Sequence, residues 1–334
     1  MTSQRRLKVA VVQGGPSSEA EVSRASARGV AQALERAGHR VVTHELDSFL
    51  PELLRTGGFD VVFPVVHGAF GEDGCLQGLL EILGLPYVGS PVLASALAMN
   101  KVAARAMFAL AGLPIAEGRS YARGGRAREA AEAARRDLGA RLVVKPASHG
   151  SAIGVSRIEA VAPIDSVVEA IESAWALGDV ALVEHFARGR EVTCGVIERG
   201  GCEAFPPTEI EAPSDPFYNF EARYAPGRSV HTCPARLPPA VTEAVQKAAV
   251  AAHQALGCRD LSRVDFVVGD DDSAEQLTLL EVNTLPGMTP TSLFPEAAER
   301  HGIPMWDLCD ALVIRAHARG PVAHVPSRSL PRVS

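Results

Sequence analysis

Short apolar runs alternate with amphipathic segments along the first part of the chain. The run LKVAVVQ, residues 7–13, is apolar enough to be a strand buried on both faces of a sheet. After the turn GGPSS, residues 19–38 follow a helical pattern that ends at a glycine. Two further runs, HRVVTHEL at 39–46 and FDVVFPVV at 59–66, repeat the strand pattern. The alternation predicts an α/β protein whose N-terminal domain, residues 1–98, has a doubly wound parallel sheet.

The rest of the chain predicts two more units of strands and helices. A length of 334 residues suits two or three domains. We expect a central domain at 99–188 and a C-terminal domain at 189–334. An irregular Pro-rich stretch at 206–234 is long for a plain connection, and this is typical of a lid or a binding loop. The expected elements are helices at 100–112, 240–257 and 306–319, and strands at 141–145, 181–186, 190–198, 262–268 and 278–283.

The segment TLLEVNTLPGMTPTSL, residues 278–293, combines a strand with two oxygen ligands. The side-chain alternation of a strand places Glu281 and Asn283 on one face. The same alternation directs Leu280 and Val282 into the core. Two polar oxygens on one face of an otherwise apolar strand are typical of a metal site.

A second strand, SRVDFVV at 262–268, adds another carboxylate. Arg263 and Asp265 share its polar face. Any one of these acids taken alone would be interpreted as a solvated surface residue. Oxygen ligands without Cys or His are those that Mg²⁺ takes. Together the two strands predict a Mg²⁺ site formed by Asp265, Glu281 and Asn283.

Composition restricts the class of protein and its partners. Hydrophobic residues make up 47% of the chain and charged residues 22%, which excludes a disordered chain. A net charge of −6 argues against nucleic-acid binding through a broad basic face. No stretch nears 18 uncharged apolar residues and the first apolar run is too short for a signal peptide, so we expect neither membrane insertion nor export. Six cysteines without a CxxC pair are typical of reduced thiols in the cytoplasm.

Two lysines and a Gly-rich loop are candidates for phosphate contacts. Lys145 ends a buried strand and precedes PASHGSAIG, in which Gly150 and Gly154 let the backbone close over an anion and Ser151 adds a hydroxyl. On its own this loop fits an ordinary hairpin turn equally well. Lys101 lies in a helical segment that is otherwise apolar, where a lysine usually faces solvent.

Two motifs of the N-terminal part leave alternatives open. GGPSSEAEVS follows the first strand without the glycine spacing of a dinucleotide-binding turn, and this argues against an oxidoreductase. Glu19 begins a helix, where the helix dipole alone also favours an acid. In HGAFGEDG, His67 is either a buried turn residue or a direct participant in the chemistry, and Glu72 and Asp73 are interpreted as turn residues.

These segments resemble the D-alanine:D-alanine ligases of the ATP-grasp superfamily. The resemblance covers nearly the whole chain and implies a three-domain ATP-grasp architecture. Eight ordered motifs are far more specific than a lone Gly-rich loop. They are GGPSSEAEVS (14–23), HGAFGEDG (67–74), the lysine of MNK (99–101), VVKPASHGSAIGV (143–155), VEHFARGREVT (183–193), FYNFEARY (217–224), RVD (263–265) and EVNTLPGMTPTSL (281–293).

The resemblance implies the reaction and its partners. Such enzymes ligate two D-alanines at the expense of ATP through a D-alanyl phosphate, release ADP and phosphate, and supply peptidoglycan synthesis. The implied cofactors are ATP and two Mg²⁺ ions, with Mn²⁺ as a substitute. The implied partners are D-alanine and ATP, without nucleic acid or membrane, and the implied assembly is a homodimer in the cytoplasm.

The resemblance also implies roles for residues that bind ATP. Lys101, Lys145 and Arg223 contact phosphates. The adenine is held by Glu184 and by the backbone of His185 and Ala187, and the ribose is held by Glu191.

Other implied roles concern the two D-alanines. Glu19 accepts the first ammonium and forms a hydrogen-bonded triad with Ser151 and Tyr224, which favours an amine as the acceptor. Arg263 and the backbone N–H of Gly287 form the oxyanion hole. The second carboxylate rests on Ser292 and on the N–H of Leu293, where we expect a helix to begin. His67 contacts substrate.

Three positions depart from the usual family pattern. Arg223 stands where a lysine is usual, which keeps the charge but changes a point donor into a planar fork. His149 replaces a common glutamate and Asn100 a frequent aspartate. Two alternatives stay open: a related ATP-grasp ligase that uses D-lactate, D-serine or another amino acid as second substrate, and a nucleotide-binding protein without ligase activity.

Overall fold

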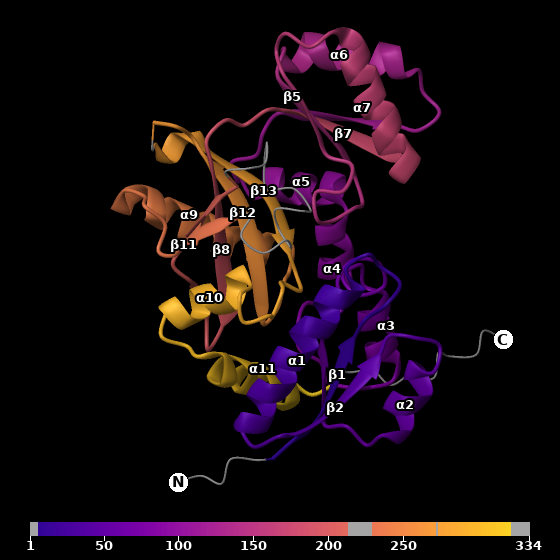
Figure 1. Cartoon of the computed structure of the whole chain (residues 1–334), viewed down its shortest axis with the longest axis vertical. Coiled ribbons are helices and arrows are strands. Elements are labelled where there is room, and N and C mark those ends of the chain that lie inside the picture. The colour runs from indigo at the N-terminus through magenta and orange to yellow at the C-terminus, as the bar shows by residue number, and fades with distance from the viewer. Residues whose placement is uncertain (1–5, 213–228, 272, 322–334) are drawn as a thin grey trace, which may run out of the picture.

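The computed structural model describes residues 6–212, 229–271 and 273–321 (Figure 1). Their strands form three sheets that lie one after another along the longest axis of the molecule. The N-terminal sheet lies at one end, the central sheet at the other, and the C-terminal sheet between them.

The N-terminal sheet is parallel, in the order β2-β1-β3, and helices cover both of its faces. The side-chain period of two sends Val9 and Val11 toward one face, and Ala10 and Val12 toward the other. The doubly wound arrangement predicted from the sequence is therefore confirmed. Its elements are β1 (Lys8–Gln13), α1 (Ala20–Arg36), β2 (Arg40–Glu45), α2 (Leu50–Thr56), β3 (Val61–Pro64) and α3 (Cys75–Ile82).

One of the helices on this sheet comes from the far end of the chain. Helix α11 (Met305–Arg319) packs beside α1, with Leu308 and Leu312 in the same core as Val30 and Leu34. The division of the chain at 98 and 188 stays a prediction.

The central sheet is antiparallel, in the order β4-β7-β5-β6. Two helices share its core, in which Ala131 and Ala134 of one helix meet Val167 and Ile171 of the other. These elements are β4 (Gly118–Ala122), α6 (Ala127–Leu138), β5 (Leu142–Pro146), β6 (Ser156–Ile158), α7 (Ile164–Leu177) and β7 (Val180–His185).

The C-terminal sheet has the order β11-β10-β8-β12-β13, with β9 also paired to β8. Helices α4, α5 and α9 bury one face, where Phe108 meets Val264 and Phe266. Helix α10 packs against β8 through Phe294, which lies beside Phe205. The elements are α4 (Val92–Met99), α5 (Lys101–Leu110), β8 (Arg190–Glu198), β9 (Cys202–Ala204), β10 (Thr208–Glu211), β11 (Val230–Thr232), α9 (Pro239–Ala255), β12 (Leu261–Val268), the 3₁₀ helix η1 (Ala274–Gln276), β13 (Leu277–Asn283) and α10 (Leu293–Arg300).

The prediction of an irregular stretch at 206–234 is wrong at its two ends. Strands β10 and β11 pair antiparallel, with Ile210 opposite His231. A strand of three or four residues is too short to show a period in the sequence. The middle of the stretch, 213–228, lies outside the described residues.

Among the described helices, none is long and apolar enough to cross a membrane alone. The pair α4 and α5 reaches the required length and composition only together, and the chain bends by 105° between them. Both helices contribute Ala94, Ala104 and Phe108 to the core under the C-terminal sheet.

Candidate functional site

A pocket between the central and C-terminal sheets collects the residues predicted to bind ATP. Its lining includes Lys101 from α5, residues that follow β5, the end of β7 and one edge of β13. The six described residues predicted to bind ATP are all in the lining: Lys101, Lys145, Glu184, His185, Ala187 and Glu191.

Buried charges in this pocket neutralise one another. Glu184 is only 6% exposed, and its carboxylate receives both Lys145 and Arg105. Lys101 lies 3.5 Å from Glu281, and its Nζ also donates to the backbone oxygen of His149. That last contact uses the backbone, so the replacement of a glutamate by His149 leaves it intact.

Two arginines were not predicted: one lines this pocket, and the other, Arg105, contacts the lining residue Glu184. Arg157 of β6 lines the pocket and stacks over the ring of Phe186, with its guanidinium carbon 4.5 Å from the ring centroid. The short strand that carries Arg157 gave no sequence signal. Arg105 lies one helical turn after Lys101 on α5, and this spacing could have indicated it.

Asn100 caps helix α5 and so fixes the position of Lys101. Its side-chain oxygen accepts from the N–H groups of Val102 and Ala103, both at 3.1 Å. A carboxylate would accept the same two hydrogen bonds, so Asn100 and the aspartate frequent in the family are equivalent here.

We therefore expect Asn100→Asp to keep the free energy of unfolding within about 0.5 kcal/mol of the wild-type value, and Asn100→Ala to lower it by about 1 kcal/mol. Urea denaturation followed by circular dichroism measures both. Equal stability of the alanine and aspartate variants would show that the cap contributes nothing.

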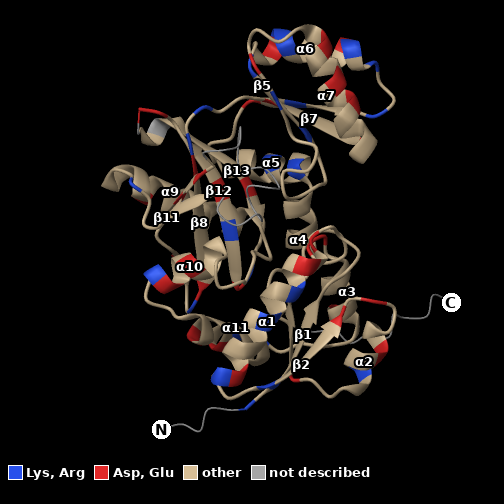
Figure 2. Cartoon of the chain, in the orientation of Figure 1, with Lys and Arg blue, Asp and Glu red and all other residues tan. Residues whose placement is uncertain are grey.

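Strands β12 and β13 form the wall of the pocket and bring the predicted metal ligands together. Asp265 pairs with Glu281 and Arg263 with Asn283 across the two strands. Figure 2 shows coloured segments that interrupt the otherwise uncharged ribbons of β12 and β13. Thr193 of β8, which was not predicted, donates to Asp265 over 2.6 Å.

The prediction that Leu280 points into the core is wrong. The register shifts after Asp265, so that Phe266 pairs with Leu279 and Leu280 is an extra residue. A β-bulge of this kind turns one side chain out of the alternation. Leu279 fills the core instead, and Leu280 lines the pocket beside Glu281.

The donor set of these strands fits Mg²⁺. Two carboxylates and an amide offer hard oxygen atoms without sulfur or imidazole. The Asn283 amide lies 3.1 Å from an Asp265 oxygen, and Arg263 donates to both Asp265 oxygens over 2.9 and 2.8 Å. Arg263 and Asn283, which contact Asp265, both line the second pocket described below.

A second pocket lies farther along the same face of these two strands, between the N-terminal sheet and the C-terminal sheet. It collects the described residues predicted to bind D-alanine: Glu19, His67, Ser151, Arg263, Gly287, Ser292 and Leu293. Ser151 donates to Glu19 over 2.6 Å, across 132 positions of sequence. Tyr224, the third predicted member of the triad, and Arg223 lie outside the described residues.

The loop after Asn283 closes one end of the second pocket. A Cβ at Gly287 would lie 2.8 Å from the hydroxyl of Ser292, so this position requires glycine or a shift of that side chain. Helix α10 begins at Leu293, as predicted, with Ser292 at its N-cap. The Ser292 hydroxyl contacts that of Thr289 at 2.7 Å.

Two titratable groups of the HGAFGEDG turn face the same pocket. His67 is 5% exposed, its Nε2 has no hydrogen-bond partner among the described residues, and burial lowers its pKa. Glu72 lies in the turn, as predicted, where it accepts from the N–H of Gly68 over 2.6 Å, and it also lines the pocket. Burial raises the pKa of Glu72 to about 8.

The raised pKa of Glu72 makes stability depend on pH. The folded protein retains a proton that the unfolded chain releases from pH 4.5 upward, so stability falls as pH rises from there to about 8. Glu72→Gln keeps an oxygen for Gly68 without the charge. We expect it to raise the free energy of unfolding by about 1 to 3 kcal/mol at pH 9 and to change it little at pH 5.

Thermal unfolding of the free protein between pH 5 and 9 measures this difference. The matched control is Glu132→Gln, which removes an exposed carboxylate from α6. Parallel pH curves for wild type and Glu72→Gln would contradict the expectation.

Comparison with known proteins agrees with this geometry. The family description "D-ala D-ala ligase C-terminus" matches residues 107–314 and "D-ala D-ala ligase N-terminus" matches 51–90. The D-alanine–D-alanine ligase of Geobacter sulfurreducens is 42% identical, covering 94% of this chain and 96% of that protein. That of Gluconobacter oxydans is 45% identical, covering 94% and 100%.

Two solved structures extend the comparison to three dimensions. The D-alanine–D-alanine ligase of Bacillus anthracis complexed with ATP gives a TM-score of 0.78 at 28% identity, covering 94% of this chain and 98% of that one. The VanG D-Ala:D-Ser ligase of Enterococcus faecalis gives 0.79 at 28% identity, covering 94% and 100%.

Proposed function

The chain belongs to the D-alanine–D-alanine ligase family: it is an ATP-dependent ligase that joins two D-alanines for cell-wall synthesis, and we propose that the reaction passes through a D-alanyl phosphate. A carboxylate oxygen of the first D-alanine attacks the γ-phosphorus of ATP, and ADP leaves. The amine of the second D-alanine then attacks the carbonyl carbon, loses a proton and displaces inorganic phosphate.

The observation that carries this proposal is that the two pockets share one face of strands β12 and β13. Glu281 faces the first pocket, whereas Arg263 and Asn283 face the second. A phosphoryl donor in one pocket and a carboxylate acceptor in the other therefore meet at strands β12 and β13. Both steps develop negative charge at that meeting point, where cations stabilise it.

In the first pocket, the charged side chains hold the nucleotide. Lys101 and Lys145 contact phosphate oxygens, and the pairing of Lys145 with Glu184 positions both groups before ATP arrives. Glu184 and the backbone of His185 and Ala187 hold the adenine. Glu191, at the start of β8, binds the ribose.

Asp265, Glu281 and Asn283 would hold Mg²⁺, two ions when the triphosphate is present, and Mn²⁺ is a substitute with the same oxygen preference. The ions would neutralise charge on the phosphates. Thr193 and Arg263, which contact Asp265, orient its carboxylate for this task.

In the second pocket, Glu19 accepts the ammonium of the first D-alanine while Ser151 fixes its carboxylate. Arg263 and the N–H of Gly287 stabilise the oxyanion of the tetrahedral intermediate. The carboxylate of the second D-alanine binds the Ser292 hydroxyl and the N–H of Leu293 at the start of α10. His67 contacts substrate from the buried side of the pocket.

The second candidate is ligation of another acceptor. VanG, a D-Ala:D-Ser ligase, is as similar in fold as the D-alanine–D-alanine ligases, so D-serine is the first alternative to test, and D-lactate the next. The Ser151–Glu19 contact, completed by Tyr224 as the resemblance implies, supports D-alanine as the acceptor.

A phosphate-release assay with D-alanine, L-alanine, D-serine and D-lactate, with chromatography of the products, tests both candidates. Of the four compounds, we expect only D-alanine to give phosphate release, with D-alanyl-D-alanine as the product. A mixed product with D-serine or D-lactate would transfer the assignment to the second candidate, and no release with any substrate would refute ligase activity.

We also propose that the enzyme acts as a homodimer in the cytoplasm, where ATP is made. Its six cysteines, including the exposed Cys75, are free thiols in the structure, which supports a reducing compartment. Sedimentation equilibrium distinguishes a dimer from a monomer.

A further inference from the structure

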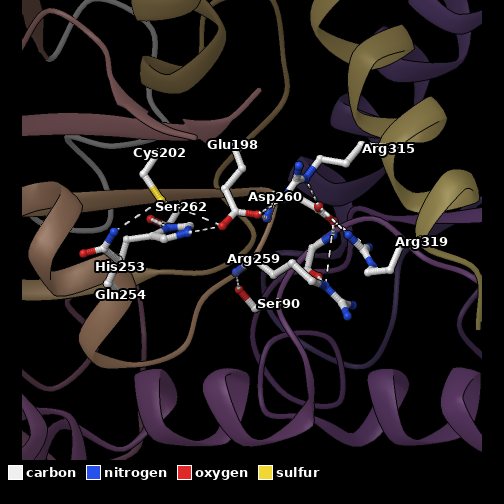
Figure 3. A network of polar contacts seen from close by, with 11 residues as sticks. Ser90, Glu198, Cys202, His253, Gln254, Arg259, Asp260, Ser262, Arg315 and Arg319 are labelled. Carbon is white, nitrogen blue, oxygen red and sulfur yellow. Dashed lines mark hydrogen bonds and ion pairs between the residues drawn. The ribbon is translucent and has the colours of Figure 1, made fainter. Parts of the chain in front are cut away.

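Three side chains of metal-binding type form a cluster at the C-terminal sheet, on the face that α9 covers and away from the two pockets. Glu198 ends β8, Cys202 begins β9, and His253 lies in the last turn of α9. Figure 3 shows the three side chains pointing toward one another. Within residues 6–212, 229–271 and 273–321, this is the one group of His, Cys and acidic side chains arranged to hold an ion, with ligand atoms within 4.8 Å of one another.

The distances match those between ligands of one tetrahedral ion. Oε1 of Glu198 lies 3.8 Å from Sγ of Cys202 and 3.7 Å from Nε2 of His253. Two atoms bound to the same Zn²⁺ at the usual lengths of about 2.0 to 2.3 Å lie roughly 3.3 to 3.6 Å apart. A movement of a few tenths of an ångström would therefore bring Glu198 Oε1 into bonding geometry with its two neighbours.

We propose that Glu198, Cys202 and His253 form a binding site for Zn²⁺ that is separate from the Mg²⁺ site. Sulfur and imidazole ligands select Zn²⁺ over Mg²⁺, which prefers oxygen. Three protein ligands leave a fourth position for water. On binding, the Cys202 thiol loses its proton to solvent and the sulfur binds as the thiolate.

His253 is aimed into the cluster. Its side chain is 0% exposed, and its Nε2 has no hydrogen-bond partner among the described residues. Nδ1 lies 2.8 Å from the hydroxyl of Ser262. When Nδ1 carries the proton and donates it to Ser262, the lone pair of Nε2 faces Glu198 and Cys202, which is the arrangement a metal-binding histidine requires.

Hydrogen bonds with neighbouring residues position the other two ligands. Oε2 of Glu198 accepts from Arg315 over 2.5 Å and from the N–H of Asp260 over 3.1 Å, and this leaves Oε1 for the ion. Sγ of Cys202 is 3.7 Å from the side-chain nitrogen of Gln254. Cys202 is partly exposed and Gln254 is exposed, so the ion enters from solvent past Gln254.

The position of the cluster in the fold indicates a structural role for the ion. Ser262 and Arg263 are neighbours on β12 and project to opposite faces, so the cluster lies away from the D-alanine pocket. The bound ion would link the β8–β9 hairpin, which carries Glu198 and Cys202, to α9, which carries His253. Through Arg315 it also joins α11, which packs on the N-terminal sheet. We infer that Zn²⁺ stabilises the fold and takes no part in the chemical steps.

Cobalt(II) tests the site because a thiolate bound to Co²⁺ gives a charge-transfer absorption that oxygen ligands do not give. The protein is stripped of metal, supplied with excess Mg²⁺ to fill the other site, and titrated with Co²⁺. We expect one equivalent of Co²⁺ to produce the band, Zn²⁺ to abolish it, and Zn²⁺ to raise the melting temperature.

Cys202→Ser removes the sulfur with little change in size. We expect it to abolish the band and the thermal shift, and to weaken Zn²⁺ binding at least about a hundredfold in competition with a chromophoric chelator. The matched control is Cys75→Ser, which removes an exposed thiol from α3 and should keep both signals. Circular dichroism of Cys202→Ser without metal confirms that it folds.

Three results would overturn the proposal: no thiolate band in the wild type, a band that survives in Cys202→Ser, or one that is lost in Cys75→Ser. Each is independent of ligase activity, so the outcome does not depend on the acceptor that the enzyme uses.

Discussion

Replacing Glu281 with glutamine is expected to lower kcat by at least about a thousandfold while the fold is kept, which corresponds to about 4 kcal/mol of lost transition-state stabilisation. Glu281 lies opposite Asp265 on paired strands and 3.5 Å from Lys101. We propose that its carboxylate serves two purposes: it is a charged ligand of the metal, and it holds Lys101 toward the phosphates. Glutamine keeps the shape and removes the charge that both purposes require.

Single-turnover phosphate release at saturating Mg²⁺, ATP and D-alanine measures this loss. Glu169→Gln, which removes an exposed carboxylate from α7, controls for a general effect of the substitution. The Glu281→Gln melting temperature should stay within a few degrees of the wild-type value, because Glu281 lies at the pocket rather than in the core. Turnover near the wild-type value would remove Glu281 from the metal site.

The fold was largely predictable because its core elements carry strong local patterns. The run at 7–13 is apolar throughout and becomes β1, and the period at 19–38 becomes α1. Helix α7 was not predicted, although Val167, Ala170 and Ile171 follow a helical period and are buried.

The errors have a different origin, because they concern contacts between distant segments. The period of two cannot foresee the bulge that turns Leu280 into the first pocket, since the bulge exists only relative to β12. The sequence indicates only a turn at Glu72. It cannot place Glu72 in the second pocket, because Glu19 and Arg263, which line that pocket with it, lie far away in sequence. Likewise no local pattern joins Glu198, Cys202 and His253.

The site itself was predictable to the extent that its residues lie in recognisable motifs. Among the described residues, those predicted to bind the nucleotide line one pocket and those predicted to bind D-alanine line another. Motif order could not show that one pair of strands carries residues of both pockets on a single face. Their individual roles stay predictions. Arg263 offers the most direct test of them because it lines the second pocket and contacts Asp265, a predicted metal ligand.

Arg263→Lys is expected to lower kcat/KM at least about tenfold, equivalent to roughly 1.4 kcal/mol, and Arg263→Met by about a hundred- to a thousandfold. The guanidinium donates through Nε and Nη2 to both oxygens of Asp265 over 2.9 and 2.8 Å. We propose that the same planar fork, which has five N–H donors, also contacts the oxyanion in the second pocket. A lysine keeps the charge but cannot serve both positions at once.

Steady-state kinetics with D-alanine as the varied substrate separates two explanations. If Arg263 stabilises the transition state, kcat falls with both substitutions and falls further with methionine. If it only holds Asp265, the loss should be recovered at high Mg²⁺, because the remaining ligands still bind the ion. Arg119→Lys, at an exposed position on β4, is the matched control. Unchanged kcat/KM in Arg263→Lys would move the oxyanion role to another donor, and the N–H of Gly287 would then be the remaining candidate.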